Sequence, residues 1–337
     1  LKTDGSGNLG WTAAGGGGAI DGLSDAKLEG ANFTGGLSIG HAMTAATLGF
    51  ANYNTAIGVT ALDALTEGDL NVAVGYNALT ANTTGTGNTA IGYEALKVNT
   101  TGSYNSAYSM NSLRANTTGS NNIASGVSSL YANTTGSDNI AFGKNALKAN
   151  TTGSYNIASG YQSLDANTTG SNNIASGASS LTNNTTGSYN VASGKSSLSA
   201  NTTGSYNIAS GYQSLISNTT GNYNTASGSE AMRSNTTGVT NTASGYGSLI
   251  SNTTGGYNTA SGSQAMRSNT TGSYNVAFGR RAGYDITTGT YNTIIGYDSD
   301  VSASGSINQI VIGYNAVGTT DNTVLLGNGS ITNWLPT

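Results

Sequence analysis

One unit of a 17-residue repeat reads Asn150-Thr-Thr-Gly-Ser-Tyr-Asn-Ile-Ala-Ser-Gly-Tyr-Gln-Ser-Leu-Asp-Ala166. Its opening tetrapeptide, Asn-Thr-Thr-Gly, recurs without any slip in spacing. Two less regular copies come before the first perfect one, so fourteen units fill residues 48–285. A fixed period of this length is typical of a solenoid, in which each repeat is one coil stacked on the next. The tetrapeptide starts at Asn82, Asn99, Asn116, Asn133, Asn150, Asn167, Asn184, Asn201, Asn218, Asn235, Asn252 and Asn269.

The composition excludes several classes of protein. The 337 residues include 50 Gly, one Pro and no Cys, and only 8% are charged. So much Gly and so little charge also fits a disordered chain, but the strict period and the recurring apolar positions argue against disorder. A net charge of -4 predicts no nucleic-acid partner. The sequence has no apolar run of membrane-spanning length and no signal peptide, so we expect no membrane insertion.

Two atypical segments flank the repeats. In the N-terminal segment, residues 1–47, the stretch from Leu1 to Trp11 predicts a hairpin whose turn is built from Gly and Asn. Gly15 to Gly18 predict a flexible joint. His41 is the only histidine, and we assign it no metal or catalytic role because no Cys or carboxylate cluster lies near it in the sequence.

The C-terminal segment, residues 286–337, is more apolar than the repeats. Two of its Ile- and Val-rich strands keep the 17-residue register, and the step from Gly313 to Gly327 shortens to 14 residues. Atypical terminal coils close the open end of a solenoid. We therefore expect capping coils here, with Trp334 and Leu335 covering the last one.

The pattern inside each unit predicts one coil of a parallel β-solenoid. With the Asn of Asn-Thr-Thr-Gly as position 1, positions 6 to 10 form a short strand and positions 12 to 15 a second one. Gly at positions 4 and 11 marks corners where positive φ or a close backbone approach excludes a Cβ. Leu or Met at position 15 supplies one bulky apolar anchor per coil. Positions 5, 6, 12, 13 and 16 vary and are expected to face solvent.

Position 9 is Ala in all fourteen copies, which indicates a crowded face. A single stack of such coils buries little apolar surface, so oligomerisation is expected. We interpret the packed Ala face as the contact in a homotrimer, either intertwined or side by side. Representative members are Ala124, Ala158, Ala175, Ala192 and Ala209.

Position 7 is Asn in all fourteen copies. Stacked coils place identical side chains about 4.8 Å apart, and amides at that spacing can bond to one another along the stack. A structural Asn ladder is the favoured interpretation, and a ligand-binding role is the alternative. The ladder comprises Asn54, Asn71, Asn88, Asn105, Asn122, Asn139, Asn156, Asn173, Asn190, Asn207, Asn224, Asn241, Asn258 and Asn275.

The stretches Asn54-Thr-Ala-Ile-Gly58 and Asn71-Val-Ala-Val-Gly75 resemble the head repeats of trimeric autotransporter adhesins. That resemblance implies a left-handed parallel β-roll, although the family's coils are commonly 14 residues long. Nearly the whole chain also looks like tail-fibre-type shafts of phages, which repeat Asn-Thr-Ala-Ile-Gly and Asn-Thr-Thr-Gly. In that group the closing segment often precedes a self-cleaving chaperone domain. The resemblance therefore implies that Thr337 is a processed end, and the alternative is that it only ends an expressed fragment or the ordered density.

The resemblance implies a structural fibre shaft of an extracellular virion tail fibre, which contributes to attachment to a host surface receptor. A bacterial cell-surface adhesin is the alternative, and its exposed Tyr rows would bind glycans. An ice-binding solenoid is a further alternative, weakened because adjacent Thr residues point to different sides of an extended chain. We expect no enzyme activity, no metal and no cofactor. The candidate glycan contacts are Tyr206, Tyr212, Tyr223, Tyr257 and Tyr274.

Overall fold

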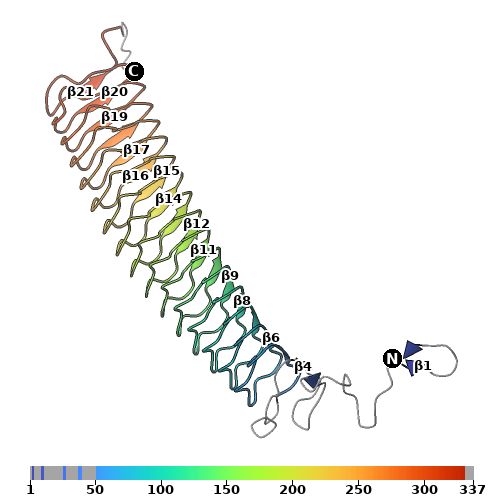
Figure 1. Ribbon diagram of the computed structural model, residues 1–337. Helices are drawn as coiled ribbons and strands as arrows, with labels where there is room; N and C mark the ends of the chain where they lie inside the picture. Colours follow the sequence, from blue (N-terminus) through green and yellow to red (C-terminus); the bar gives the residue numbers. More distant parts are fainter. Residues whose placement is uncertain (1, 4–8, 11–25, 28–36, 40–50, 331–337) are drawn as a thin grey trace, which may run out of the picture. The chain divides into compact units, whose positions relative to one another are not determined.

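The computed structural model describes residues 2–3, 9–10, 26–27, 37–39 and 51–330. The chain divides into two compact units, residues 1–139 and 140–337. The described residues form an all-β parallel β-solenoid with 17-residue coils, as the period predicts (Figure 1). Within them there is no helix, and hence none that could cross a membrane.

The first unit begins with a short antiparallel pair. Strands β1 (Lys2–Thr3) and β2 (Leu9–Gly10) pair in the register that the predicted hairpin requires. Strand β3 (Ala26–Lys27) pairs antiparallel with β4 (Leu37–Ile39). From β4 onward every pairing in this unit is parallel. The strands that follow are β5 (Thr55–Ile57), β6 (Val72–Val74), β7 (Thr89–Ile91), β8 (Ser106–Tyr108) and β9 (Ile123–Ser125).

The second unit is a stack of parallel strands in sequence order. Each strand pairs with the next at a step of 17 residues until β20, which pairs with β21 at the predicted step of 14. The strands are β10 (Ile140–Phe142), β11 (Ile157–Ser159), β12 (Ile174–Ser176), β13 (Val191–Ser193), β14 (Ile208–Ser210), β15 (Thr225–Ser227), β16 (Thr242–Ser244), β17 (Thr259–Ser261), β18 (Val276–Phe278), β19 (Thr293–Ile295), β20 (Ile310–Ile312) and β21 (Val324–Leu326).

Each coil contains one strand, at positions 8 to 10, and the predicted second strand at positions 12 to 15 is wrong. In the coil of residues 184–200 these positions are turns, because Ser196 and Leu198 have φ of 58° and 52°. Tyr189 has φ of 60°, which also shortens the predicted strand at its start. Extended backbone requires negative φ, so residues in the left-handed region cannot continue a strand. The coils remain bonded here, since the Leu198 N–H donates to the Ser214 carbonyl (3.0 Å).

The two Gly positions have the predicted geometry. Gly194 at position 11 has φ of +132°, and an added Cβ would lie 2.6 Å from the Gly211 carbonyl oxygen. Gly187 at position 4 has no positive φ, but a Cβ there would collide with the carbonyl oxygen of Gly204 in the next coil. The corners therefore need Gly for two different reasons, conformation at one and close approach at the other.

The Ala row lies in the interior of each coil, and its assignment to a subunit contact is wrong. Ala192 is fully buried, and its register partners are Ala175 and Ala209 of the neighbouring coils. Ala124 and Ala158 are equally buried. The row is packed, as predicted, but against its own coil. No part of these methyl groups is left for another chain to contact.

Several predictions concern residues outside the described part of the chain. They are the turn of the N-terminal hairpin, the Gly15 to Gly18 joint, His41, and the covering role of Trp334 and Leu335. Thr337 and the processing predicted for it also lie there.

Candidate functional site

The Asn ladder at position 7 is confirmed within each unit. Asn190 is fully buried, and its Nδ2 donates to Asn173 Oδ1 (3.2 Å) and to the Gly204 carbonyl (2.9 Å). Its backbone N–H donates to the same Asn173 oxygen (3.0 Å). The pattern repeats with Nδ2 to Oδ1 distances of 3.0–3.2 Å from Asn54 to Asn139 and from Asn156 to Asn292. These amides are buried and bonded to one another, which favours the structural interpretation over ligand binding.

A second Asn ladder, which was not predicted from the sequence, lies at position 1. Asn184 Nδ2 donates to Asn167 Oδ1 (2.9 Å) and to the Gly187 carbonyl of its own coil (2.9 Å). The ladder ends at Asn269, whose Oδ1 is buried without a partner, because position 1 of the next coil is the apolar Ile286. The invariance of Asn in the Asn-Thr-Thr-Gly tetrapeptide was the signal that could have revealed it.

The two Thr residues of the tetrapeptide point to different environments, as expected. Thr185 at position 2 donates its hydroxyl to the Thr202 carbonyl of the next coil (3.0 Å). Thr186 at position 3 is exposed. The exposed Thr side chains at position 3 therefore form a single column, and not a flat two-column Thr array. The ice-binding alternative stays a prediction without support from these residues.

The outward side chains of the strands, at positions 8 and 10, form a regular surface that we call the sheet face. Position 8 carries exposed Ile in several coils, including Ile157, Ile174 and Ile208. Position 10 is Ser in most of the middle coils and apolar toward the C-terminal end, as in Phe278 and Ile295. The arrows of Figure 1 mark this surface in the second unit. The apolar side chains of position 8 therefore lie on the outside of the coil.

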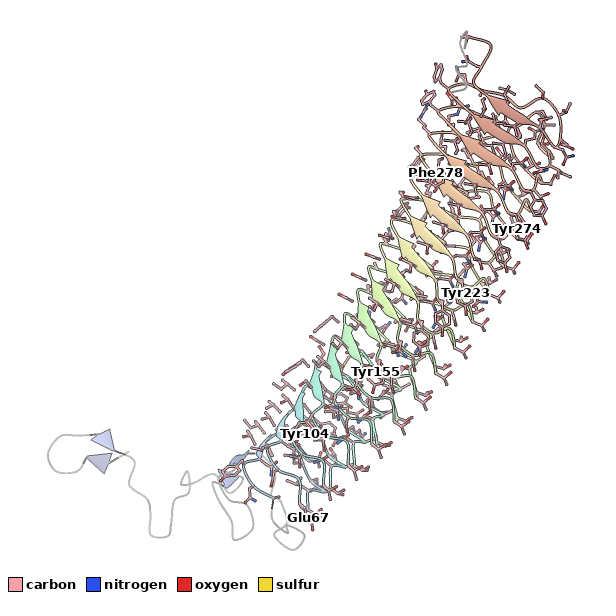
Figure 2. All side chains as sticks on the ribbon, turned by 180° about the vertical axis from the view of Figure 1, so that it is seen from behind. Glu67, Tyr104, Tyr155, Tyr223, Tyr274 and Phe278 are labelled. Atoms are coloured by element: carbon pink, nitrogen blue, oxygen red, sulfur yellow. The ribbon has the colours of Figure 1, made fainter. Side chains whose placement is uncertain are left out.

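The predicted Tyr residues are all exposed, but they belong to two columns. Tyr206, Tyr223, Tyr257 and Tyr274 lie at position 6, which we call the tyrosine column, whereas Tyr212 lies at position 12. Adjacent rings of the tyrosine column stack with centroids 4.9–5.0 Å apart and nearly parallel planes. Figure 2 shows Tyr155, Tyr223 and Tyr274 along one edge of the second unit. Stacking covers the ring faces within a run, so a sugar can reach a ring face only where a run ends.

One charged cluster in the first unit departs from the expected exposure of position 13. Glu94 is buried, and its carboxylate accepts hydrogen bonds from Lys97 Nζ (2.7 Å) and Arg114 Nε (2.6 Å). These two bonds lower the pKa of Glu94 to about 2. The Arg114 guanidinium also lies over the ring of Tyr131, 5.7 Å from its centroid. All the charges of the cluster are satisfied locally, which indicates a structural role.

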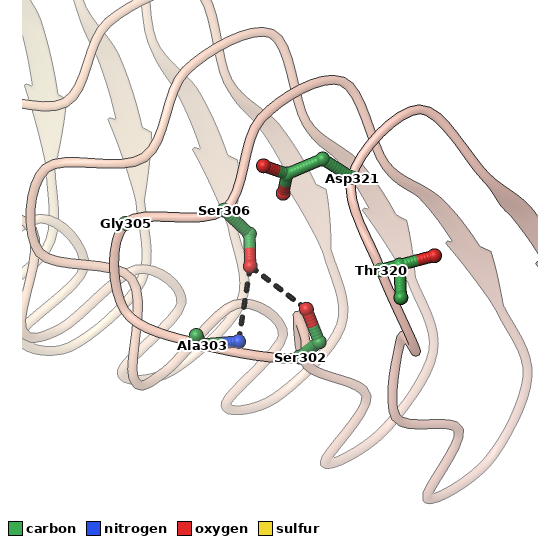
Figure 3. Close-up of a pocket in the computed structure, with 6 residues that line it drawn as sticks. All are labelled: Ser302, Ala303, Gly305, Ser306, Thr320 and Asp321. Atoms are coloured by element: carbon green, nitrogen blue, oxygen red, sulfur yellow. Dashed lines mark hydrogen bonds between the residues drawn. The ribbon is translucent and has the colours of Figure 1, made fainter.

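A shallow depression of about 420 Å³ lies in the second unit near its C-terminal coils (Figure 3). It is lined by Ser302, Ala303, Gly305, Ser306, Thr320 and Asp321. The Ser306 hydroxyl already bonds to the Ala303 N–H and the Ser302 hydroxyl (both 3.0 Å), and Asp321 accepts from the Ile307 N–H (2.9 Å). The polar groups therefore hold the loop together. Among the described residues no three His, Cys, Asp or Glu side chains gather into a metal site.

The surfaces available for function are thus the sheet face and the two Tyr columns. No protein-family model matches this chain, and no curated protein is significantly similar to it.

Proposed function

We propose that this protein is a structural fibre shaft that associates with copies of itself and supports attachment to a receptor on a host surface. Its interior supports that proposal, because the buried amides, methyl groups and Leu side chains of each coil serve to stack the coils. The outer surface repeats with the same period, as a shaft built for reach and rigidity requires. An extracellular tail fibre is the setting that the sequence resemblance implies.

The sheet face is the observation that carries the self-association. Ile174 and Ile208 are 41% and 46% exposed, with Val191 between them in the same column. Contiguous exposed apolar side chains mark an interaction surface. Completing the burial of each Ile would contribute about 1 kcal/mol, and the column supplies many such residues. The sheet face thus replaces the Ala row as the subunit contact, and the resemblance implies three copies.

The test compares the wild-type protein with the double variant Ile174→Lys, Ile208→Lys. We expect the wild type to show a mass of about three times 33.6 kDa by light scattering, and the variant to shift toward the monomer with unchanged circular dichroism. The matched control is Ser199→Lys, which adds a positive charge at position 16, where Lys148 lies in another coil. A wild type that is monomeric, or a double variant that keeps the wild-type mass, would refute the proposed contact.

A further inference from the structure

The tyrosine column of the second unit is interrupted at two places. Tyr155 and Tyr189 flank Asn172, and Tyr223 and Tyr257 flank Thr240. Each flanking Tyr lies one coil away from the shorter residue. On either side of the second interruption the rings stack continuously, from Tyr189 to Tyr223 and from Tyr257 to Tyr291. At Thr240, therefore, one Tyr ring is missing from an otherwise continuous stack.

Exposure shows that one Tyr ring face at each interruption is open. Tyr206, which is stacked on both sides, is 48% exposed, whereas Tyr223, which is stacked on one side, is 60% exposed. Tyr155 is 61% exposed, like Tyr223 at the same place relative to the other interruption. Tyr189 and Tyr257, on the other side of the two interruptions, are each 51% exposed, close to the value for Tyr206, so the open ring faces are those of Tyr155 and Tyr223.

We propose that each interruption is a binding slot for one pyranose ring of a neutral glycan, which stacks on the open Tyr face in the place of the missing ring. Stacked rings in this column step by 5.0 Å per coil, so Tyr223 and Tyr257 are about 10 Å apart, twice the step. That spacing admits one ring in the place of the missing Tyr, in van der Waals contact on both faces. Thr240 is too short to fill the slot and forms its floor.

The chemistry around the slot favours a sugar over an aromatic side chain. A pyranose ring has apolar C–H faces and a rim of hydroxyl groups. Each slot offers one open aromatic face together with an exposed polar side chain, Thr240 in one slot and Asn172 in the other. An aromatic side chain would leave these polar groups without partners, whereas a sugar would use them.

The absence of charge favours a neutral sugar. Positions 2 to 10 of the three coils that form the Thr240 slot contain no Asp, Glu, Lys or Arg, and the same is true of the three coils around Asn172. The two slots are four coils apart, about 19 Å at one strand spacing per coil. A long glycan lying along the stack could therefore enter both, which raises its apparent affinity.

Filling the slots tests the proposal. In the double variant Asn172→Tyr, Thr240→Tyr, each new ring completes the column. The backbone tolerates this change, because Thr240 has φ of 56° and Tyr257 has φ of 59°, and each N–H makes the same bond to the preceding coil. The probes are the hexasaccharides of cellulose, mannan and chitin, measured by isothermal titration. We expect at least one to bind the wild type and to bind the double variant at least tenfold more weakly.

Opening a new slot supplies the converse test. Tyr206→Thr removes the middle ring between Tyr189 and Tyr223, and we expect one additional binding site. The control is Thr203→Tyr, which adds an exposed ring at position 3 beside an intact run and is expected to leave binding unchanged. Thermal unfolding of every variant checks that the fold is retained.

Three results would overturn the proposal. They are no binding by any of the three hexasaccharides, equal binding by the wild type and the slot-filled variant, and loss of self-association in place of sugar binding when the slots are filled. The last would show that a second copy of the chain occupies the slots. The first two results do not depend on the sheet face, so the slot proposal can fail while the shaft proposal stands.

Discussion

Removing one amide from the position 7 ladder tests how the solenoid is held together. Asn190 Oδ1 accepts from the N–H of Asn207 (3.0 Å) and from its Nδ2 (3.2 Å), and Asn190 Nδ2 donates to Asn173 and Gly204. Asn190→Ala removes all four bonds. Three of the partner groups keep another bond: Asn173 Oδ1 keeps the Asn190 N–H, the Gly204 carbonyl keeps Asn201, and Asn207 Nδ2 keeps Gly221. The Asn207 N–H is left buried without an acceptor.

The expected loss of stability follows from the number of hydrogen bonds that Asn190→Ala removes. One orphaned buried N–H costs about 1–3 kcal/mol, and each of the other lost bonds contributes about 0.5–1.5 kcal/mol. We therefore expect Asn190→Ala to lower the local free energy of unfolding by on the order of 4 kcal/mol, which is at the severe end for a single substitution.

Native-state hydrogen exchange is the appropriate assay, because long repeat arrays do not unfold as one two-state unit. We expect amides of the coils around residue 190 to exchange about a thousandfold faster in the variant. The control is Asn183→Ala, an exposed Asn at position 17, where other coils have Ala149 and Ala166. A difference between the two variants below about 1 kcal/mol would refute the view that the ladder stabilises the coils.

Two further predictions concern the core and the C-terminal coils. Ala192→Leu overpacks the interior and should lower the free energy of unfolding by about 1–3 kcal/mol or more, measured by chemical denaturation. Ala158→Leu and Ala175→Leu should have the same effect. The control is Ser193→Leu, on the exposed face of the same strand, which should leave the free energy of unfolding unchanged. Burial raises the pKa of Asp300 to about 6 despite hydrogen bonds from the N–H groups of Asp285 and Val301, so the protonated form is favoured in the folded state. Its stabilising contribution is complete below the unfolded pKa of about 4 and is lost as pH rises through about 6. Melting temperatures of the wild type should therefore fall relative to Asp300→Asn between pH 4 and 7.5, and a constant difference would contradict this assignment.

Local rules predicted the coil's corners and its first ladder because the period itself places identical residues side by side. Gly194 and Asn190 have the same neighbours in every coil, so one unit was enough to infer their geometry. The turns at Ser196 and Leu198 could not be inferred in this way. Both residues adopt positive φ without being Gly, and nothing in their side chains indicates that conformation. It is imposed by the closure of the coil around the buried Leu.

The sequence by itself determined that the chain is a solenoid, where its coils begin, and that strand side chains alternate between two sides. The alternation of side chains along a strand implies that Ala192 faces away from Val191 and Ser193, but it does not show which side is the interior. Only the tertiary structure decided that, because the interior of a coil this narrow already holds Leu198 and two Asn side chains and has room for no more than a methyl group. The larger Ile and Val side chains of position 8 are therefore outside, on the sheet face.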